Sequence, residues 1–195
     1  MFRLKGVLKK IRMSSLYTRN GDDGFTGLLG AGRVAKSDER IEALGAIDEI
    51  TSVLGLARSL CKTRESANLL IQIQRDLYLL MSEVATTPNH AETFRRINAQ
   101  HIVWLEEQIA QLENVVDIPQ EFIIPGDTPS AAALDLARTV TRRAERQVAK
   151  LWHKQQIGNP NILQYLNRLS SFCFVLELYE NQQSGFQHPT LAKNG

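Results

Sequence analysis

The sequence has few cysteines, no long apolar run and no excess of charge of one sign. Its two cysteines, Cys61 and Cys173, lie far apart and form no CxxC pair, so we expect buried thiols in a reducing compartment. No apolar run approaches the roughly 20 residues that cross a bilayer, so we expect no contact with a membrane. With 23 basic and 21 acidic residues, the net charge of +2 is too balanced for general nucleic-acid binding.

The usual catalytic and metal-binding motifs are also absent. The four histidines are scattered and no Glu-x-x-His pair occurs, which disfavours a di-iron bundle. The sequence contains no Walker motif, no GxGxxG and no recognisable nucleophile motif. The chemistry must therefore be sought in the glycine-rich and arginine-rich stretches, where polar groups are denser than a helical bundle requires.

The length of 195 residues, with 43% hydrophobic and 23% charged residues, is typical of one globular domain. We expect that domain to span residues 14–182, followed by a polar tail at 183–195. Residues 1–13 form a basic leader, with five basic residues and no acid among the first twelve. A mitochondrial transit peptide and a start at Met13 both remain open for the leader.

Apolar residues recur at helical spacing in five segments, at about 37–60, 65–85, 97–112, 128–150 and 161–179. The pattern predicts an all-α, up-down bundle of five helices with ferritin-like or four-helix-bundle-like packing. A glycine-rich N-terminal arm at 14–36 precedes it, with short extended pieces expected at 16–17 and 28–29. Ser37 or Asp38 is the expected N-cap of the first helix, and Asp127 or Thr128 that of the fourth.

The arm and the start of the first helix could bind an anion. The glycines of 18–27 let backbone N–H groups turn toward a phosphate, although a plain turn fits the same residues. Arg33, Lys36 and Arg40 could reach phosphates near the N-terminus of the first helix, whose dipole also favours anions. The alternative is an ordinary solvated helix start.

The fourth helix carries arginines along one face. Arg138, Arg142 and Arg146 are spaced i, i+4, i+8, and such a row indicates an anionic partner or a solvated face. Asp48 sits among isoleucines in the first helix, so we expect it to be partly buried and to need a cation. Asn167 interrupts an apolar helix, which is typical of specific hydrogen bonding or of a core amide.

Four segments, in order, resemble the trimeric ATP:cob(I)alamin adenosyltransferase family of the propanediol-utilisation type, from about residue 16 to 175. These are YTRNGDDGFTGLLG, GRVAKSDERIEALGAIDEI, FIIPGDTPSAAALDLARTVTRRAER and YLNRLS. The resemblance implies a homotrimeric helical-bundle enzyme with active sites between subunits. Such an enzyme transfers the 5′-deoxyadenosyl group of ATP to the cobalt of reduced cobalamin, the corrinoid substrate, and releases triphosphate.

The resemblance also implies roles for individual residues. Asp48 and Arg138 match an ion pair that links neighbouring subunits beside the active site and the corrinoid. Phe122 matches the aromatic residue under the lower corrin face, where it displaces the axial base of the cobalt. The expected ATP contacts are Thr18, Arg19, Asn20, Gly21, Lys36, Arg40, Arg142 and Asn167. Mg²⁺ is expected on the triphosphate, with no protein ligand assigned.

The expected partners follow from the same resemblance. They are a cobalamin reductase and a B12-dependent enzyme, in the cytoplasm or, in a eukaryote, in the mitochondrial matrix. Four positions depart from the common family pattern, at Asp23, Thr51, Asp127 and Ser171. These departures leave open a weakened relative that binds ATP or corrinoid as a sensor or cobalamin chaperone. A structural bundle with no small-molecule site is a third alternative.

Overall fold

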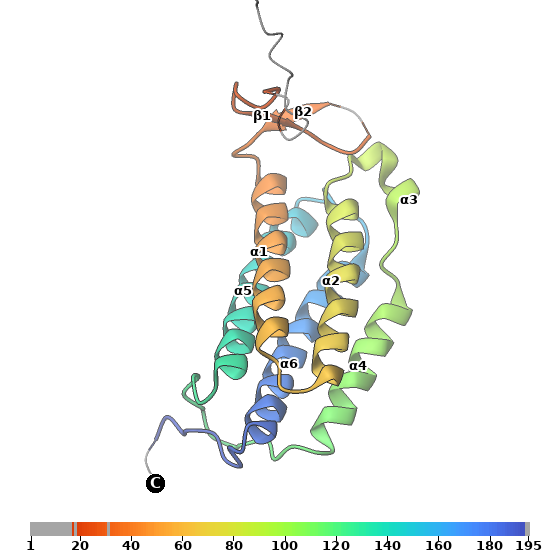
Figure 1. Cartoon of the computed structure of the whole chain (residues 1–195). Coiled ribbons are helices and arrows are strands. Elements are labelled where there is room, and N and C mark those ends of the chain that lie inside the picture. Colours follow the sequence, from red (N-terminus) through yellow and green to blue (C-terminus); the bar gives the residue numbers. More distant parts are fainter. Residues whose placement is uncertain (1–16, 18, 31, 194–195) are drawn as a thin grey trace, which may run out of the picture.

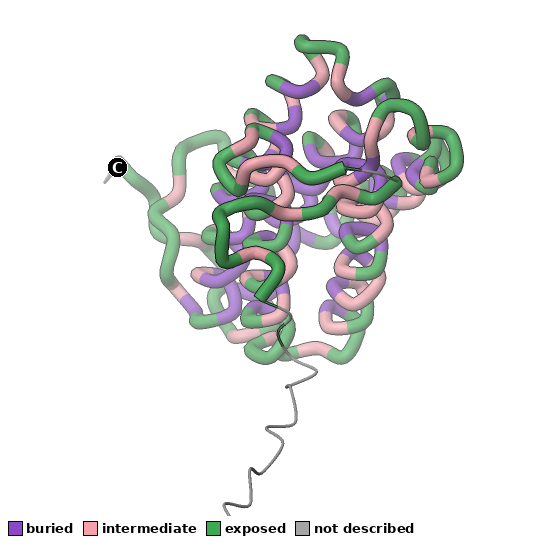
Figure 2. Tube along the Cα trace, turned by 90° about the horizontal axis from the view of Figure 1, so that it is seen from above, coloured by how far each residue is buried: buried purple, intermediate pink, exposed green. Residues whose placement is uncertain are grey.

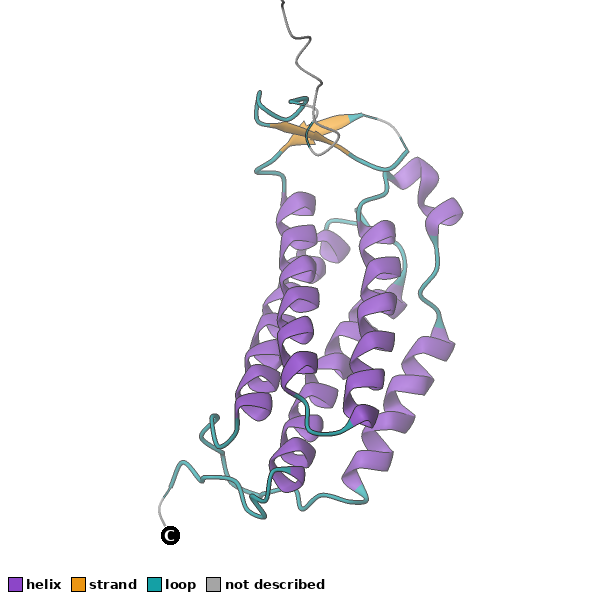
Figure 3. Ribbon diagram, in the orientation of Figure 1, coloured by secondary structure: helices purple, strands orange, loops and turns teal. Residues whose placement is uncertain are grey.

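The computed structural model describes residues 17, 19–30 and 32–193 as an elongated helical bundle (Figure 1). The predictions for Thr18 and for the leader at 1–13 lie outside the described residues. The bundle is built from five long helices, α1 (Glu39–Leu60), α2 (Arg64–Val84), α4 (Ala99–Glu113), α5 (Pro129–His153) and α6 (Pro160–Gln183). A short 3₁₀ turn, η1 (Pro88–His90), and the single turn α3 (Ala91–Phe94) link α2 to α4. The predicted all-α architecture is confirmed, and Figure 3 shows that the only strands in the described part form a small hairpin.

Local capping explains where the long helices begin. The Asp38 side chain accepts from the backbone N–H of Arg40, and the Thr128 side chain accepts from that of Ala131. Pro129 follows Thr128 in the first turn, where its missing N–H costs no helical hydrogen bond. Of the paired N-cap candidates, Asp38 and Thr128 are therefore the ones used.

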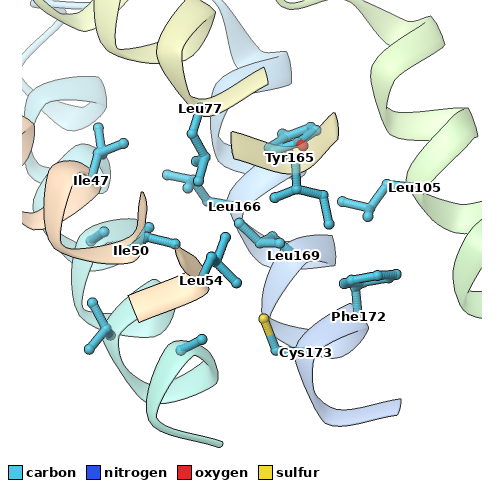
Figure 4. Packing of buried hydrophobic residues seen from close by; sticks show 14 of the residues in the cluster. Ile47, Ile50, Leu54, Leu77, Leu105, Tyr165, Leu166, Leu169, Phe172 and Cys173 are labelled. Carbon is cyan, nitrogen blue, oxygen red and sulfur yellow. The ribbon is translucent and has the colours of Figure 1, made fainter. Parts of the chain in front are cut away.

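The core lies where α1, α2, α4, α5 and α6 meet. Helix α5 packs on α1 and α6, while α6 also packs on α4 and α1 on α2. Figure 4 shows Leu54, Leu77 and Leu169 in the same hydrophobic cluster, together with the rings of Tyr165 and Phe172. Viewed from above in Figure 2, the buried stretches of the long helices lie toward the middle of the bundle. No helix in the described part of the chain is long and apolar enough to span a membrane.

The sequence predicts that both thiols are buried. The prediction is confirmed for Cys173 and is confirmed in part for Cys61. Cys173 is fully buried and Cys61 is half-buried, and the two are free thiols. Burial raises the pKa of each to about 12, so neither is a reactive thiolate at neutral pH.

One local prediction was met in part and one was wrong. The arm forms an antiparallel hairpin of β1 (Phe25–Gly27) and β2 (Arg33–Ala35), which the sequence did not predict. Of the extended piece expected at 28–29, Leu29 forms a parallel bridge with Thr86, because its N–H and C=O bond to the backbone at the end of α2. Asp48 is exposed, since its helical neighbours at i±3 and i±4 are mostly polar or glycine and face away from the core.

Candidate functional site

A cavity of about 630 Å³ opens between α4, α5, α6 and the loop that leads into α5. It runs along the N-terminal half of α5 and combines apolar with charged side chains. Its aromatic and charged lining residues, with one serine, are Phe122, Phe174, Arg138, Arg142, Glu113, Glu121, Asp135 and Ser171. A mixed lining of this kind suits a large ligand that has an apolar face and an anionic group.

Phe122 stands at the mouth of this cavity with 88% of its surface exposed. An aromatic ring with so much exposed apolar surface would gain favourable burial if the flat face of a ligand covered it. Gly126, and not Asp127, takes the left-handed backbone of this loop, with φ of 121°. The aspartate that stands in place of the family's second glycine therefore adds no backbone strain.

Arg138 lines the cavity and is bound to Asp135 one turn earlier. The Arg138 guanidinium donates from Nε to Asp135 Oδ1 at 2.7 Å, and its Nη2 lies 2.6 Å from the same oxygen. Within the described chain Arg138 makes no ion pair with Asp48, which is exposed on α1. The pair between neighbouring subunits therefore stays a prediction.

Behind this pair lies a carboxyl group that sequence reasoning missed, Glu177 of α6. Glu177 is 1% exposed, and its Oε2 has no hydrogen-bond partner among the described residues. Burial, with a smaller contribution from the charge of Asp135, raises the pKa of Glu177 to about 8 against the opposing effect of Arg138. The signal was available, since Glu177 interrupts the apolar run from Phe172 to Leu178.

Arg142 lines the same cavity one turn beyond Arg138 and is exposed. It makes no hydrogen bond or ion pair within the part of the chain that the structure describes. The adjacent Arg143 differs, because it pairs with Glu49 of α1. Of the cavity's two arginines, Arg142 is therefore the one whose guanidinium is available to an anionic ligand.

Asn167 of α6 is exposed and bonded to neighbouring side chains. Its Nδ2 donates to Glu145 Oε1 at 3.0 Å, and its Oδ1 accepts from Arg168 Nη1 at 2.8 Å. Asn167 is thus oriented on the surface of α5 and α6 rather than buried as a core amide. Its contact with a nucleotide stays a prediction.

The N-terminal arm gathers four of the residues expected to bind ATP. A Cβ atom at Gly21 would lie 3.1 Å from Lys36 Nζ, so glycine permits the close approach of the lysine. The Lys36 N–H donates to Gly24 at 2.8 Å, which closes the turn against the lysine. Arg19 takes a left-handed φ of 63°, and Asn20 follows it in the same turn.

The charge of Asp23 is neutralised within the arm. Arg33 donates from Nη1 to Asp23 Oδ2 at 2.9 Å and from Nη2 to Asp23 Oδ1 at 2.7 Å. The same guanidinium donates to the carbonyls of Asn20 and Phe25. Arg33 holds the pKa of Asp23 below its usual range, chiefly through this hydrogen bonding. Arg33 therefore stabilises the turn through its hydrogen bonds, and the negative charge of Asp23 is paired with Arg33.

Arg40 points into the bundle rather than outward. Its Nη1 donates to the carbonyls of Val84 and Thr86 at 2.7 and 2.9 Å, and its Nη2 donates to that of Gln156 at 2.9 Å. Only 5% of Arg40 is exposed, and burial lowers its pKa from the usual value. Since a guanidinium has five N–H groups, two remain for any other partner. Its contact with ATP stays a prediction.

The arm and the loop that leads into α5 lie at opposite ends of the bundle (Figure 1). Lys154, just after α5, pairs with Glu39 at the start of α1 at 2.7 Å, so α5 ends beside the point where the arm joins α1. The 25 residues of α5 span roughly 37 Å at about 1.5 Å per residue. One chain therefore holds Lys36 far from Phe122.

The chain is similar to known proteins over nearly its whole length. The sequence profile of a family described as cobalamin adenosyltransferase matches residues 16–180. The chain is 34% identical to the corrinoid adenosyltransferase of Bacillus subtilis, covering 87% of this chain and 88% of that protein. It is 35% identical to the corrinoid adenosyltransferase of Mycobacterium leprae, covering 88% and 93% of the two proteins.

Solved structures agree. One is an arginine-to-lysine variant of a PduO-type ATP:corrinoid adenosyltransferase from Lactobacillus reuteri complexed with ATP. It superposes with a TM-score of 0.84 at 38% identity, covering 91% of this chain and 99% of that one. A phenylalanine-to-alanine variant from the same organism, complexed with cobalamin and ATP, gives 0.86 at 38% identity, over 92% and 99% of the two chains. The match of the family profile over residues 16–180, with the similarity of sequence and structure over most of the chain, shows that the chain belongs to the cobalamin adenosyltransferase family.

Proposed function

We propose that this chain transfers the 5′-deoxyadenosyl group of ATP to the cobalt of a reduced corrinoid, releasing triphosphate and forming adenosylcobalamin. The observation that carries the proposal is the family match over residues 16–180. The cavity supports it, because it combines the exposed Phe122 with Arg142, whose guanidinium has no partner among the described residues. The relatives crystallised with cobalamin and ATP, or with ATP alone, share this fold.

The chain need not supply a nucleophile, because the reduced cobalt is one. Its electron pair forms the Co–C5′ bond while the C5′–O bond of ATP breaks, and the departing oxygen keeps that bond's electrons on the triphosphate. The protein's task is to align two substrates and to neutralise the leaving group. Arg142 neutralises charge on the phosphates, and Phe122 covers the lower corrin face so that the axial base is displaced.

The arm, in this proposal, works with the cavity of a neighbouring copy in a homotrimer. The separation of Lys36 from Phe122 within one chain supports a composite site, since an ATP bound at Lys36 must also reach the corrinoid that Phe122 covers. Asp48 is exposed on α1, where a partner's arginine can reach it. We assign to Asp48 and Arg138 the ion pair that joins the two copies beside the corrinoid.

In this arrangement Mg²⁺ binds together with the nucleotide. Among the described residues, no three His, Cys, Asp or Glu side chains gather to hold a metal ion. Mg²⁺ prefers a few carboxylate ligands plus phosphate oxygens, and the triphosphate supplies the latter. We place the enzyme in the cytoplasm, with a cobalamin reductase upstream and a B12-dependent enzyme downstream.

The direct test is to incubate the full chain with ATP, Mg²⁺ and chemically reduced cobalamin. We expect the absorption spectrum of adenosylcobalamin to appear, with one triphosphate released for each corrinoid converted. The alternative of a sensor or cobalamin chaperone predicts ATP or corrinoid binding with neither product. Absence of both products despite measurable ATP binding would therefore replace the enzyme with that alternative.

Replacing Asp48 with asparagine tests the composite site. We expect kcat/KM to fall at least about tenfold, because a paired arginine would lose its charged partner between the subunits. Sedimentation should still show a trimer, since one pair is a small part of such an interface. Glu49→Gln is the matched control, because Glu49 is exposed and pairs with Arg143 of its own chain. A wild-type protein that sediments only as a monomer refutes the interface.

A further inference from the structure

The C-terminal segment returns to the loop that carries Phe122. The N–H of Ala192 donates to the carbonyl of Phe122 at 2.7 Å, and the N–H of Ile124 donates to the carbonyl of Thr190 at 2.7 Å. Between them, Ile123 and Leu191 form an antiparallel bridge. Residues 190–192 are therefore paired with residues 122–124 as a short two-stranded ladder.

The Asp127 carboxylate fastens this ladder at one end. Its Oδ2 accepts from the backbone N–H of Thr190 at 2.9 Å, and its Oδ1 accepts from the Thr190 hydroxyl at 2.6 Å. Each carboxylate oxygen thus holds a separate donor of one residue. Such charge-assisted bonds are roughly twice as strong as neutral ones.

The point of attachment is itself rigid. Thr128, next to Asp127, is buried and caps α5 through the N–H of Ala131 at 3.2 Å. The Thr128 hydroxyl also donates to Asn181 Oδ1 of α6 at 2.9 Å. Asp127 therefore connects the C-terminal segment to the junction of two packed helices, while Phe122 lies five residues earlier on an exposed loop.

We propose that Asp127 and Thr190 form a latch that holds residues 190–192 against residues 122–124 and thereby positions Phe122 at the mouth of the cavity. Phe122 is 88% exposed, so packing of its side chain does not fix its place. Its backbone is fixed instead, by hydrogen bonds at Phe122 and Ile124. Asp127 is in this sense a positioning residue for corrinoid binding, an inference that rests on the proposed function.

The latch explains the departure of Asp127 from the glycine common in the family. A glycine there has no side-chain acceptor for Thr190, whereas the aspartate supplies two carboxylate oxygens that accept hydrogen bonds from it. The change tightens the loop without altering the cavity lining, because Asp127 contributes no surface to it. Its effect should therefore fall on the corrinoid and not on ATP.

The first experiment measures hydrogen exchange of the Ile124 amide in the full chain without substrates. Asp127→Gly and Thr190→Val should each speed exchange. We expect about a tenfold increase for the glycine variant, because the net free energy of the lost hydrogen bonds is enough to shift the local opening equilibrium by about that factor. Thr190→Ser keeps the hydroxyl and should restore slow exchange. Asp117→Asn, an exposed carboxylate on the same loop, is the matched control and should change nothing. Unchanged exchange in Asp127→Gly overturns the latch.

The second experiment asks whether the latch serves the corrinoid. Asp127→Gly should raise KM for the corrinoid several-fold and leave KM for ATP unchanged. The fraction of cob(II)alamin that becomes four-coordinate on the protein, measured by electron paramagnetic resonance, should fall in the same variant and recover in Thr190→Ser relative to Thr190→Val. Faster exchange with an unaltered corrinoid KM and spectrum overturns the positioning role.

The two proposals fail in distinguishable ways. A wild-type protein that forms no adenosylcobalamin refutes the proposed function, and with it the role of the latch in turnover. The exchange measurement uses no corrinoid, so it still decides whether Asp127 holds residues 190–192.

Discussion

Replacing Arg142 with alanine is expected to lower kcat/KM for ATP by about a hundredfold or more, while the protein stays folded. The guanidinium lines the cavity from the middle of a rigid helix and has no partner in the described chain. It is therefore free to neutralise charge that develops on the departing triphosphate. The fold should survive, because the exposed side chain supports no neighbouring group. Steady-state kinetics, with thermal melting alongside, measures both effects.

Arg146→Ala is the matched control for this variant. Arg146 lies one turn further along α5, carries the same charge and is exposed, but it does not line the cavity. Its replacement should change kcat/KM by less than about twofold, as expected for a surface charge remote from the ligand. For Arg142→Lys, kcat/KM should lie between the values of the wild type and of Arg142→Ala, since lysine keeps the charge and loses the planar guanidinium. If Arg142→Ala retained full activity, the triphosphate would lie elsewhere.

Replacing Arg40 with methionine is expected to destabilise the protein by about 3 kcal/mol or more. The change removes three hydrogen bonds from a buried guanidinium and leaves the carbonyls of Val84, Thr86 and Gln156 without that donor. Those carbonyls belong to the end of α2 and to the loop between α5 and α6. Urea unfolding at fixed protein concentration measures the loss.

Arg58→Met serves as the control, because Arg58 is an exposed arginine of the same helix. Its replacement should change the free energy of unfolding by no more than about 0.5 kcal/mol. A wild-type unfolding curve for Arg40→Met would show that other donors replace the guanidinium. If Arg40 also contacts ATP, KM for ATP rises in Arg40→Met at temperatures where the variant remains fully folded.

The helices could be predicted because their signals are local. An N-cap such as Thr128, a proline after it and apolar residues at i+3 and i+4 all lie within one or two turns. The prediction for Asp48 failed for a related reason. Its sequence neighbours Ile47 and Ile50 are buried, but adjacent residues on a helix point in different directions.

The contacts that shape the site could not be predicted, because they join distant parts of the chain. Arg40 bonds to carbonyls 44, 46 and 116 residues away, and Thr190 bonds to Asp127 across 63 residues. No spacing rule relates such pairs. The family resemblance gathered Phe122 and Arg142 into one site, and the cavity brings them together. It did not indicate that Arg33 neutralises Asp23, which depends on the register of the hairpin.

The separation of the arm from the cavity mouth has a genetic consequence. On the composite site proposed above, each active site takes its arm from one chain and its cavity from another. A chain damaged at Lys36 and a chain damaged at Arg142 would each be inactive alone. When both are expressed in one cell, a mixed assembly contains a site with an intact arm beside an intact cavity. Two defective alleles of this gene would thus complement one another, whereas two alleles damaged at the same end would not.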